Sequence, residues 1–166
     1  MYMYARALRL SRGQILLVRP LRNGDVETVA EVFDRLGDES RRARFNGAKP
    51  RLSPAELEHL ARVDSTRHVL VAYLEGDERP VAIARLVRDG SSAEIAFEVA
   101  DDHQRLGIGS ALTGELLADA RAAGITEVTA LVASDNSAAV HLLRRVLDRL
   151  EVRFEGPELA IRASLA

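Results

Sequence analysis

Two glycines stand one residue apart in segment 102–112, Asp-His-Gln-Arg-Leu-Gly-Ile-Gly-Ser-Ala-Leu, between a predicted strand and a predicted helix. Gly107 and Gly109 have no Cβ, so a bulky anion can approach the main chain closely. The N–H groups of this turn lie at the positive end of the helix dipole. The segment therefore predicts a phosphate or pyrophosphate site, and the alternative is a glycine-rich turn that only starts a helix.

Two other phosphate-binding loops do not fit this segment. A P-loop ends in Gly-Lys-Ser/Thr, which is absent, and the dinucleotide-binding fingerprint has a third glycine where this chain has Leu112.

A pair of acidic residues is the second feature that could do chemistry. Glu94 and Glu98 lie in the predicted strand 93–99, where their spacing points both side chains to one face. We expect this strand to be central and largely buried. Burial raises the pKa of a carboxylate toward neutrality, which suits a general base acting on an ammonium group. Alternatively, the two glutamates lie on a solvated face and bond to Arg85 or Arg88.

The elements that must position these residues follow from hydrophobic periodicity and turn residues. Short connections make the first strands antiparallel, whereas the helix after the glycine loop must join two parallel strands. This order predicts an α+β fold with a parallel crossover in the middle of the sheet. The expected strands are 15–19, 68–74, 80–87, 93–99, 127–133, 150–154 and 159–163, and the expected helices begin at 25, 53, after the glycine loop, and at 136.

Several cap residues fix where these helices begin and end. Asp25 precedes an amphipathic segment, Ser53-Pro54-Ala55-Glu56 is a capping box, and Gly124 follows the long helix. The arginine-rich segment 38–51 is polar and turn-rich, so we expect a surface loop there.

Length and composition limit the class of protein. The 166 residues, 47% of them hydrophobic, suffice for one domain with a core. We expect residues 1–14 to be a loose arm and residues 15–166 to form the single domain. A net charge of -2 argues against nucleic-acid and membrane partners, and the absence of cysteine fits a cytoplasmic protein. Four histidines without paired spacing predict no metal site.

The motif Gln104-x-x-Gly107-x-Gly109 resembles the signature Gln/Arg-x-x-Gly-x-Gly/Ala of the GNAT acetyltransferase superfamily. Matching features run in the right order from about residue 15 to about residue 161, including Val18-Arg19-Pro20 before Asp25. The segments 40–45, 52–57, 81–85 and 93–97 look most like bacterial protein lysine acetyltransferases of the Pat type. The resemblance implies a mixed, mostly antiparallel sheet with a parallel βαβ crossover and helices on both faces.

The resemblance also implies an N-acetyltransferase that uses acetyl-coenzyme A as co-substrate. The glycine loop would bind the pyrophosphate, and the ends of two splayed strands would bind the pantetheine arm. The residues expected to contact acetyl-coenzyme A are Val99, Asp101, Gln104, Arg105, Leu106, Gly107, Ile108, Gly109, Ser110, Asn136 and Ala139. Asn136 is also a good helix N-cap, and both roles are compatible.

Glu94 stands where protein lysine acetyltransferases of this superfamily carry their catalytic glutamate, and Glu98 is the second candidate. The chain departs from the family at Leu143, where many members have a tyrosine that protonates the leaving thiolate. Three readings follow: a protein lysine acetyltransferase, an acetyltransferase of small amines, or a module that binds coenzyme A without catalysis. Pat-type members often carry a fused regulatory domain, for which this length leaves no room, and a homodimer is possible because similar proteins form dimers.

Overall fold

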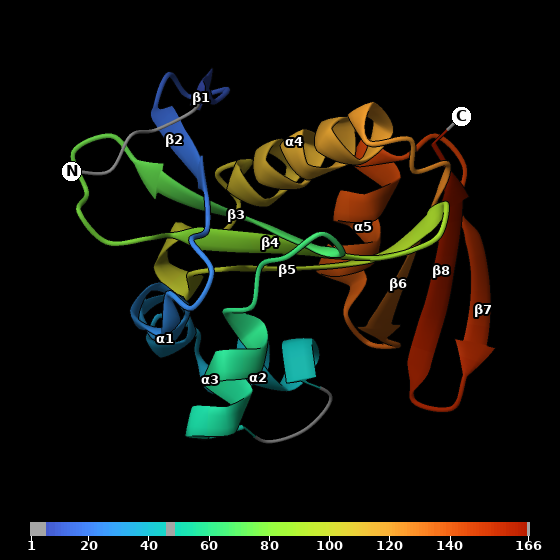
Figure 1. The fold of residues 1–166 in the computed structure, drawn as a ribbon, viewed down its shortest axis with the longest axis horizontal. Coiled ribbons are helices and arrows are strands. Elements are labelled where there is room, and N and C mark those ends of the chain that lie inside the picture. Colours follow the sequence, from blue (N-terminus) through green and yellow to red (C-terminus); the bar gives the residue numbers. More distant parts are fainter. Residues whose placement is uncertain (1–5, 46–48, 166) are drawn as a thin grey trace.

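The computed structural model describes residues 6–45 and 49–165, which form a single mixed sheet flanked by helices (Figure 1). The described strands number eight and lie in the order β1-β2-β3-β4-β5-β6-β8-β7. The strands are β1 (Arg6–Arg9), β2 (Ile15–Pro20), β3 (Arg67–Leu74), β4 (Ala82–Asp89), β5 (Ser92–Val99), β6 (Glu127–Ala133), β7 (Glu151–Glu155) and β8 (Glu158–Ser164). The helices are α1 (Val26–Asp34), α2 (Asp38–Phe45), α3 (Pro54–Leu60), the 3-10 turn η1 (Asp101–His103), α4 (Ile108–Ala122) and α5 (Ser137–Val146).

One strand pair differs from the others in direction. β5 and β6 are parallel, and every other neighbouring pair in the described sheet is antiparallel. The helix α4 makes the crossover between β5 and β6, as the spacing of elements predicts. The predicted α+β class with a mostly antiparallel sheet is therefore confirmed.

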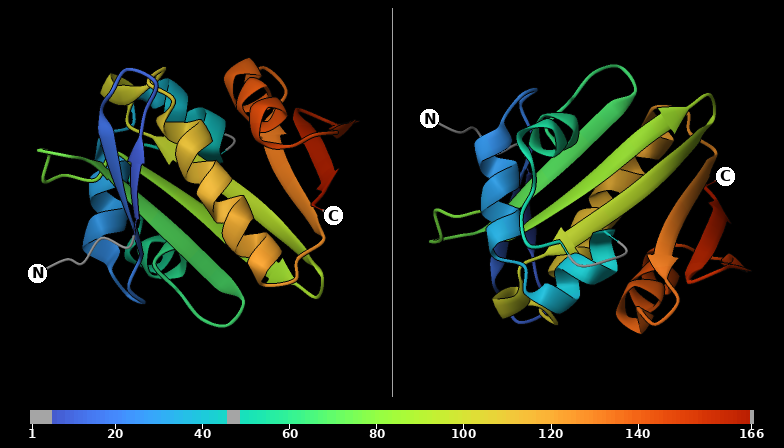
Figure 2. Two further views of the ribbon diagram at one scale, coloured as in Figure 1. Left: turned by 90° about the horizontal axis from the view of Figure 1, so that it is seen from above. Right: turned by 90° about the horizontal axis from the view of Figure 1, so that it is seen from below.

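Helices cover both faces of the sheet, each over its own apolar cluster (Figure 2). α4 lies across one face and buries Ile108, Leu112 and Leu116 against the strands. α1, α2 and α3 lie on the opposite face, where Val29 and Val32 of α1 pack on the sheet. The strands β3, β4 and β5 are thus covered from both sides, and any charged side chain on them has to find a partner or a cavity.

The cap residues read from the sequence have the expected geometry. The Asp25 carboxylate accepts a hydrogen bond from the N–H of Thr28 at 3.1 Å. Ser53 and Glu56 form a reciprocal capping box, with both bonds 3.1 Å long. Gly124 follows α4 with φ +81°, a left-handed conformation that favours glycine.

The expectation of a loose arm is wrong for residues 6–9, which form β1. This strand pairs antiparallel with β2, from Arg6 opposite Val18 to Arg9 opposite Ile15. Its guanidinium anchor Arg6 donates to both carboxylate oxygens of Asp119 on α4, at 2.8 and 2.7 Å. The sequence analysis missed this strand although its partner β2 follows within six residues, and the contact that is distant in sequence is the one with Asp119. Residues 1–5 of the expected arm lie outside the described residues.

Part of the expected surface loop 38–51 is also a helix, α2. No residue of α2 is buried, so the segment lacks the apolar periodicity that predicts a helix. Acidic Asp38 and Glu39 lie in its first turn and Arg42 and Arg44 in its last, an arrangement that complements the helix dipole. Side-chain contacts hold it: Arg41 stacks on the ring of Phe33, eight residues earlier, with Cζ 4.2 Å from the ring centroid, and Arg44 pairs with Glu98, which is distant in sequence.

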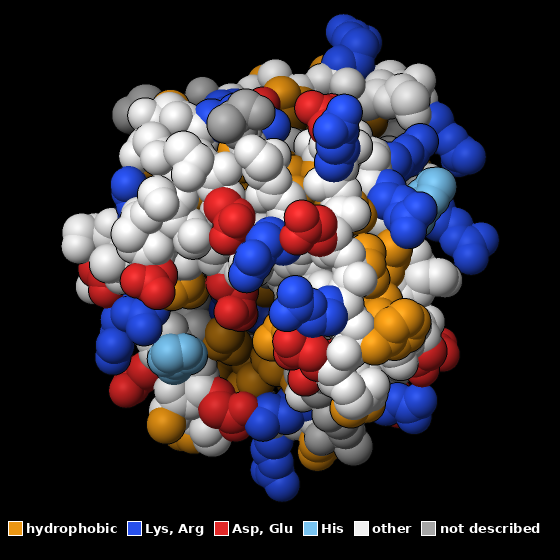
Figure 3. Space-filling model, turned by 90° about the vertical axis from the view of Figure 1, so that its right-hand side faces the viewer, with side chains coloured by type: hydrophobic (Ala, Val, Ile, Leu, Met, Phe, Trp, Pro, Cys, Tyr) orange, Lys and Arg blue, Asp and Glu red, His pale blue; other side chains and the backbone are white. Residues whose placement is uncertain are grey.

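The side of the molecule that carries β6 and β7 has hydrophobic side chains at its surface (Figure 3). Phe154, Val152 and Leu131 are the large exposed ones on these strands. Among the helices in the described part of the chain, none combines the length and the apolar character needed to cross a membrane.

Asp119 links β1, β3 and α4, because it also bonds to Nε2 of His68 at 2.7 Å. Although burial opposes the shift, hydrogen bonds from Arg6 and His68 lower the pKa of Asp119 from its usual value of 3.8. A carboxylate with a lowered folded-state pKa stabilises the fold above its unfolded pKa, and loses that contribution as the pH falls through the folded value.

Replacing Asp119 with Asn should therefore reduce the free energy of unfolding by about 1 kcal/mol at pH 7 and by less at pH 3. Urea unfolding at the two pH values measures the difference. Asp148→Asn is the control, because Asp148 is exposed and makes no side-chain bond among the described residues. An equal loss at both pH values for Asp119→Asn would contradict this account.

Candidate active site

The parallel strands β5 and β6 are paired over only part of their length. The register runs through Ser92–Glu127 and Ala93–Val128 and stops at Glu94–Thr129. β5 stays paired with β4 as far as Val99, and β6 stays paired with β8 as far as Ala133. The opening is therefore held from both sides. Its β5 wall, residues 95–99, is roughly 16 Å long at about 3.3 Å per residue, which suits an extended ligand arm.

The glycine loop lies at the far end of this opening, between η1 and the first turn of α4. Arg105 has φ +66° and Gly107 has φ +84°. Gly107 is the N-cap of α4 and provides no side-chain cap. Among the described residues, the amides from Arg105 to Ser110 have no hydrogen-bond acceptor. These amides and the helix dipole together form a concave site for an anion.

The two glycines are needed for different reasons. Gly107 has space around it but adopts a left-handed φ, which strains any residue with a Cβ. Gly109 lies against its neighbours, since a Cβ would stand 2.7 Å from Leu142 Cδ1 and 3.3 Å from Val99 Cγ2. Glycine at position 109 thus lets α4 approach α5 and the end of β5 closely.

Gln104 positions the loop through its side chain. Its Nε2 donates to the carbonyl of Val99 at 3.2 Å and to Ser40 Oγ at 3.2 Å. Ser40 in turn donates to Asp101 Oδ1 at 2.6 Å. These bonds tie the loop to the end of β5 and to α2, so Gln104 organises the loop amides in this structure.

Asn136 caps α5 after the end of β6, as its helix-capping interpretation predicts. Its Oδ1 accepts a hydrogen bond from the N–H of Ala139 at 3.1 Å, and the methyl group of Ala139 is buried in the core. Ala139 therefore helps to place α5. The side-chain amide of Asn136 remains the group of this pair that could bond to a ligand.

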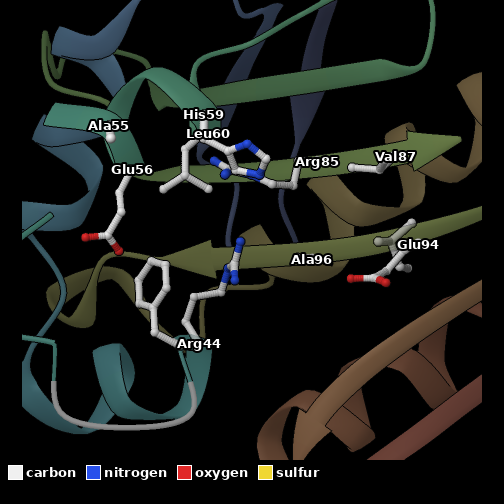
Figure 4. A pocket seen from close by; sticks show the side chains of 11 residues that line it. Arg44, Ala55, Glu56, His59, Leu60, Arg85, Val87, Glu94 and Ala96 are labelled. Carbon is white, nitrogen blue, oxygen red and sulfur yellow. The ribbon is translucent and has the colours of Figure 1, made fainter. Parts of the chain in front are cut away.

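A cavity of about 480 Å³ lies beyond the other end of the opening, between α2, α3, β4 and β5 (Figure 4). The charged groups on its wall come from all four elements: Arg44, Glu56, His59, Arg85 and Glu94. Figure 3 shows a hollow with an apolar floor and charged side chains around it on the same side of the molecule as β6 and β7.

The two candidate glutamates lie in different environments. Glu98 is 7% exposed, and its Oε2 lies 3.0 Å from Nε of Arg44 while its Oε1 lies 3.9 Å from Nη2 of Arg85. Glu94 is exposed, lines the cavity, and its carboxylate has no partner among the described residues. The expected burial holds for Glu98 and is wrong for Glu94, because α2 covers only the Glu98 end of this face.

Arg44 and Arg85 form a charged cluster with Glu98, and the sequence analysis named only Arg85 as a partner. Pairing with Arg85 is one of the alternatives stated for the glutamates, and the structure shows it for Glu98. Arg88 instead donates to the carbonyls of Gly90 and Ala123. Burial lowers the pKa of Arg85 to about 10. Arg44 carries no signal in the sequence, because it lies in the segment expected to be a loop.

Leu143, at the position of the family's tyrosine, is fully buried in the core. Its buried hydrocarbon side chain has no proton to provide. Within the described residues, no three His, Asp or Glu side chains are grouped so that they could hold a metal ion.

Comparison with known proteins decides the family. Residues 33–148 match the family described as Acetyltransferase (GNAT) family. The chain belongs to this family. The resemblance read from the glycine loop and the predicted N-acetyltransferase class are thereby confirmed, with acetyl-coenzyme A as the co-substrate.

Individual relatives cover most of this GNAT chain. It is 36% identical over 147 residues to Acetyltransferase Pat of Mycolicibacterium smegmatis. The matched region covers 86% of this chain and 43% of that relative. It is 32% identical over 134 residues to Acetyltransferase PA5475 of Pseudomonas aeruginosa, covering 78% and 72% of the two chains. The crystal structure of the GNAT domain of S. lividans PAT superposes with a TM-score of 0.87 at 28% identity, covering 96% of each chain. The chain thus spans less than half of the Mycolicibacterium relative.

Gly107→Ala should weaken coenzyme A binding about tenfold and cost roughly 1 kcal/mol of stability, because a Cβ at φ +84° forces the loop amides to move. Titration calorimetry with coenzyme A measures the dissociation constant.

Gly114→Ala in the middle of α4 is the matched control, because a Cβ there meets nothing within 4 Å. It should stabilise the protein by about 0.5–1 kcal/mol and leave the dissociation constant unchanged. Equal dissociation constants for the two variants would show that the conformation at Gly107 does not matter for binding.

Proposed function

We propose that this GNAT domain transfers the acetyl group of acetyl-coenzyme A to a lysine side chain of a protein, with Glu94 as the general base. The observation that carries the proposal is the place of Glu94. It is the last β5 residue paired with β6, it lines the cavity, and its exposed carboxylate has no partner within residues 6–45 and 49–165.

The donor is held along the opening between β5 and β6. The amides of 105–110 bind the pyrophosphate, and the pantetheine extends between the unpaired stretches 95–99 and 130–133. The thioester then emerges near Glu94, about 16 Å from the loop end of β5. Val99, Asp101 and Asn136 border this path, where main-chain and amide groups can bond to the arm.

The acceptor amine has to lose a proton before it can attack. A lysine ammonium has a pKa of about 10.4 in water, so at neutral pH it needs a base close by. Glu94 can take this proton directly or through a water molecule. Glu98 is poorly suited to the task, because two arginines share its charge and it is buried away from the cavity.

Attack of the amine nitrogen on the thioester carbon forms a tetrahedral intermediate, whose collapse breaks the carbon–sulfur bond. The electron pair leaves with sulfur as a thiolate. A thiol has a pKa of about 8.5, so the thiolate is a tolerable leaving group near neutral pH and can take its proton from solvent. Catalysis therefore does not require a tyrosine at position 143, although it gains no help there.

Several observations support a protein acceptor. The Pat relative matches 86% of the chain, and the resemblance that connects Pat-type proteins with lysine includes the segment around Glu94. The cavity opens between α2, α3 and the sheet, and its volume of about 480 Å³ suffices for a lysine side chain and part of its neighbours. A small amine or a non-catalytic role remains an outcome of the test.

Glu94→Gln should lower kcat at least 100-fold while the affinity for coenzyme A changes little. Release of coenzyme A from acetyl-coenzyme A, with a synthetic peptide that contains one internal lysine, measures turnover. Mass spectrometry of the peptide shows the site of acetylation.

Glu98→Gln is the matched control on the same strand face. It should retain kcat within a few-fold but lower the free energy of unfolding by roughly 3 kcal/mol, because Arg44 and Arg85 lose the carboxylate between them. The opposite ranking of the two kcat values would reject Glu94 as the base. Coenzyme A binding without any acetylation of lysine peptides or small amines would favour a module that binds coenzyme A without catalysis.

A further inference from the structure

Arg85 is an unusual residue for the wall of a cavity in the middle of a sheet. It is 8% exposed, and neither Nη1 nor Nη2 donates a hydrogen bond to any described residue. Its one ion-pair contact is with Glu98 Oε1, at 3.9 Å. A guanidinium has five N–H donors, so this group lies buried with most of its bonding capacity unused.

The charge around Arg85 is also out of balance. Glu98 is the carboxylate within ion-pair distance, and Arg44 shares it at 3.0 Å. The cluster of two arginines and one glutamate thus carries a formal charge of +1, and the nearest free carboxylate on the described wall, that of Glu94, is not within ion-pair distance of either arginine. Glu56, another acid on the cavity wall, is paired with Lys49. Burying an uncompensated cation is costly unless a ligand completes it, and the lowered pKa of Arg85 has the same cause.

The position of the two arginines relative to Glu94 indicates which kind of ligand could neutralise their excess positive charge. Arg85 lies opposite Ala96 in the β4–β5 register, so Glu94 is its diagonal neighbour on the same face. Diagonal neighbours lie about 7–8 Å apart, and their Cβ atoms somewhat less. Figure 4 shows Arg44 and Arg85 near the middle of the cavity, with Glu56 on one side of them and Glu94 on the other. Because Glu56 is paired with Lys49, the arginines face Glu94 as the free carboxylate on the described wall.

We propose that Arg85, with Arg44 beside it, is a carboxylate-binding subsite of the acceptor cavity, so that the preferred acceptor is a lysine with an Asp or Glu next to it. The lysine amine lies at Glu94, and the neighbouring carboxylate bonds to the unused Nη atoms of Arg85, which are buried and become reachable when the guanidinium turns toward the cavity that Arg85 lines. Arg–carboxylate pairs are directional and strong when they are sheltered from water. This proposal rests on the acetyl transfer to protein lysine proposed above.

Two peptides that differ only beside one internal lysine test the subsite, one with Asp and Glu as neighbours and the other with Asn and Gln. The wild-type domain with acetyl-coenzyme A should show a kcat/KM about tenfold higher for the acidic peptide. Arg85→Gln should bring the ratio close to one and still acetylate the amide peptide. Arg88→Gln should keep the tenfold ratio, because Arg88 lies three residues further along β4, on the opposite face, and is bonded to Gly90 and Ala123.

Equal kcat/KM values for the two peptides on the wild-type domain would overturn the subsite, whatever the variants do. Should Arg85→Gln not fold, Arg44→Gln provides the second variant, and an unchanged ratio there would also count against the subsite. If the domain binds coenzyme A but acetylates neither peptide, the proposed function itself is rejected. Nα-acetyl-lysine and its carboxamide form a last pair. If the domain prefers Nα-acetyl-lysine to its carboxamide but does not distinguish the two peptides, the acceptor is a small molecule and not a protein.

Discussion

The interruption of pairing between β5 and β6 is the constraint on which the rest of the site depends. Both strands remain fully paired on their outer sides, β5 with β4 and β6 with β8, so the gap between them cannot close by bending one strand alone. Backbone groups along the gap have no strand partner on that side, and an extended ligand with amide groups is one way to provide one. The loop amides at one end and Glu94 at the other give this gap a direction, from phosphate to reacting carbon.

The helix α2 connects the two ends of the site, although it buries none of its own residues. Ser40 bonds to Asp101 and receives a bond from Gln104, so the first half of α2 holds the glycine loop. Arg44 in its second half covers Glu98 and forms part of the cavity wall. Donor loop and acceptor cavity therefore share one short helix. Any movement of α2 changes both, which links acceptor recognition to the geometry of the bound donor.

Features with a clear local residue pattern were predictable, and features without one were not. The glycine loop, the caps at Asp25 and Ser53 and the parallel crossover follow from local residue types and from connection lengths. β1 and α2 were missed because they have no clear apolar periodicity, although β2 and Phe33 lie close to them in sequence. Their contacts with Asp119 and Glu98 are distant in sequence and leave no local pattern. The contrast between Glu94 and Glu98 depends on where α2 lies over the sheet. Strand alternation places both on one face but cannot say which of them that helix covers.

An amide NMR titration with coenzyme A tests the central claim most directly. The account predicts saturable shifts in the amides of 105–110, together with those of 95–99 and 130–133 along the opening, while β1 and β7 stay unchanged. Failure to saturate at millimolar coenzyme A would contradict it. Saturation with the loop amides unshifted would do so equally, because the diphosphate would then bind elsewhere.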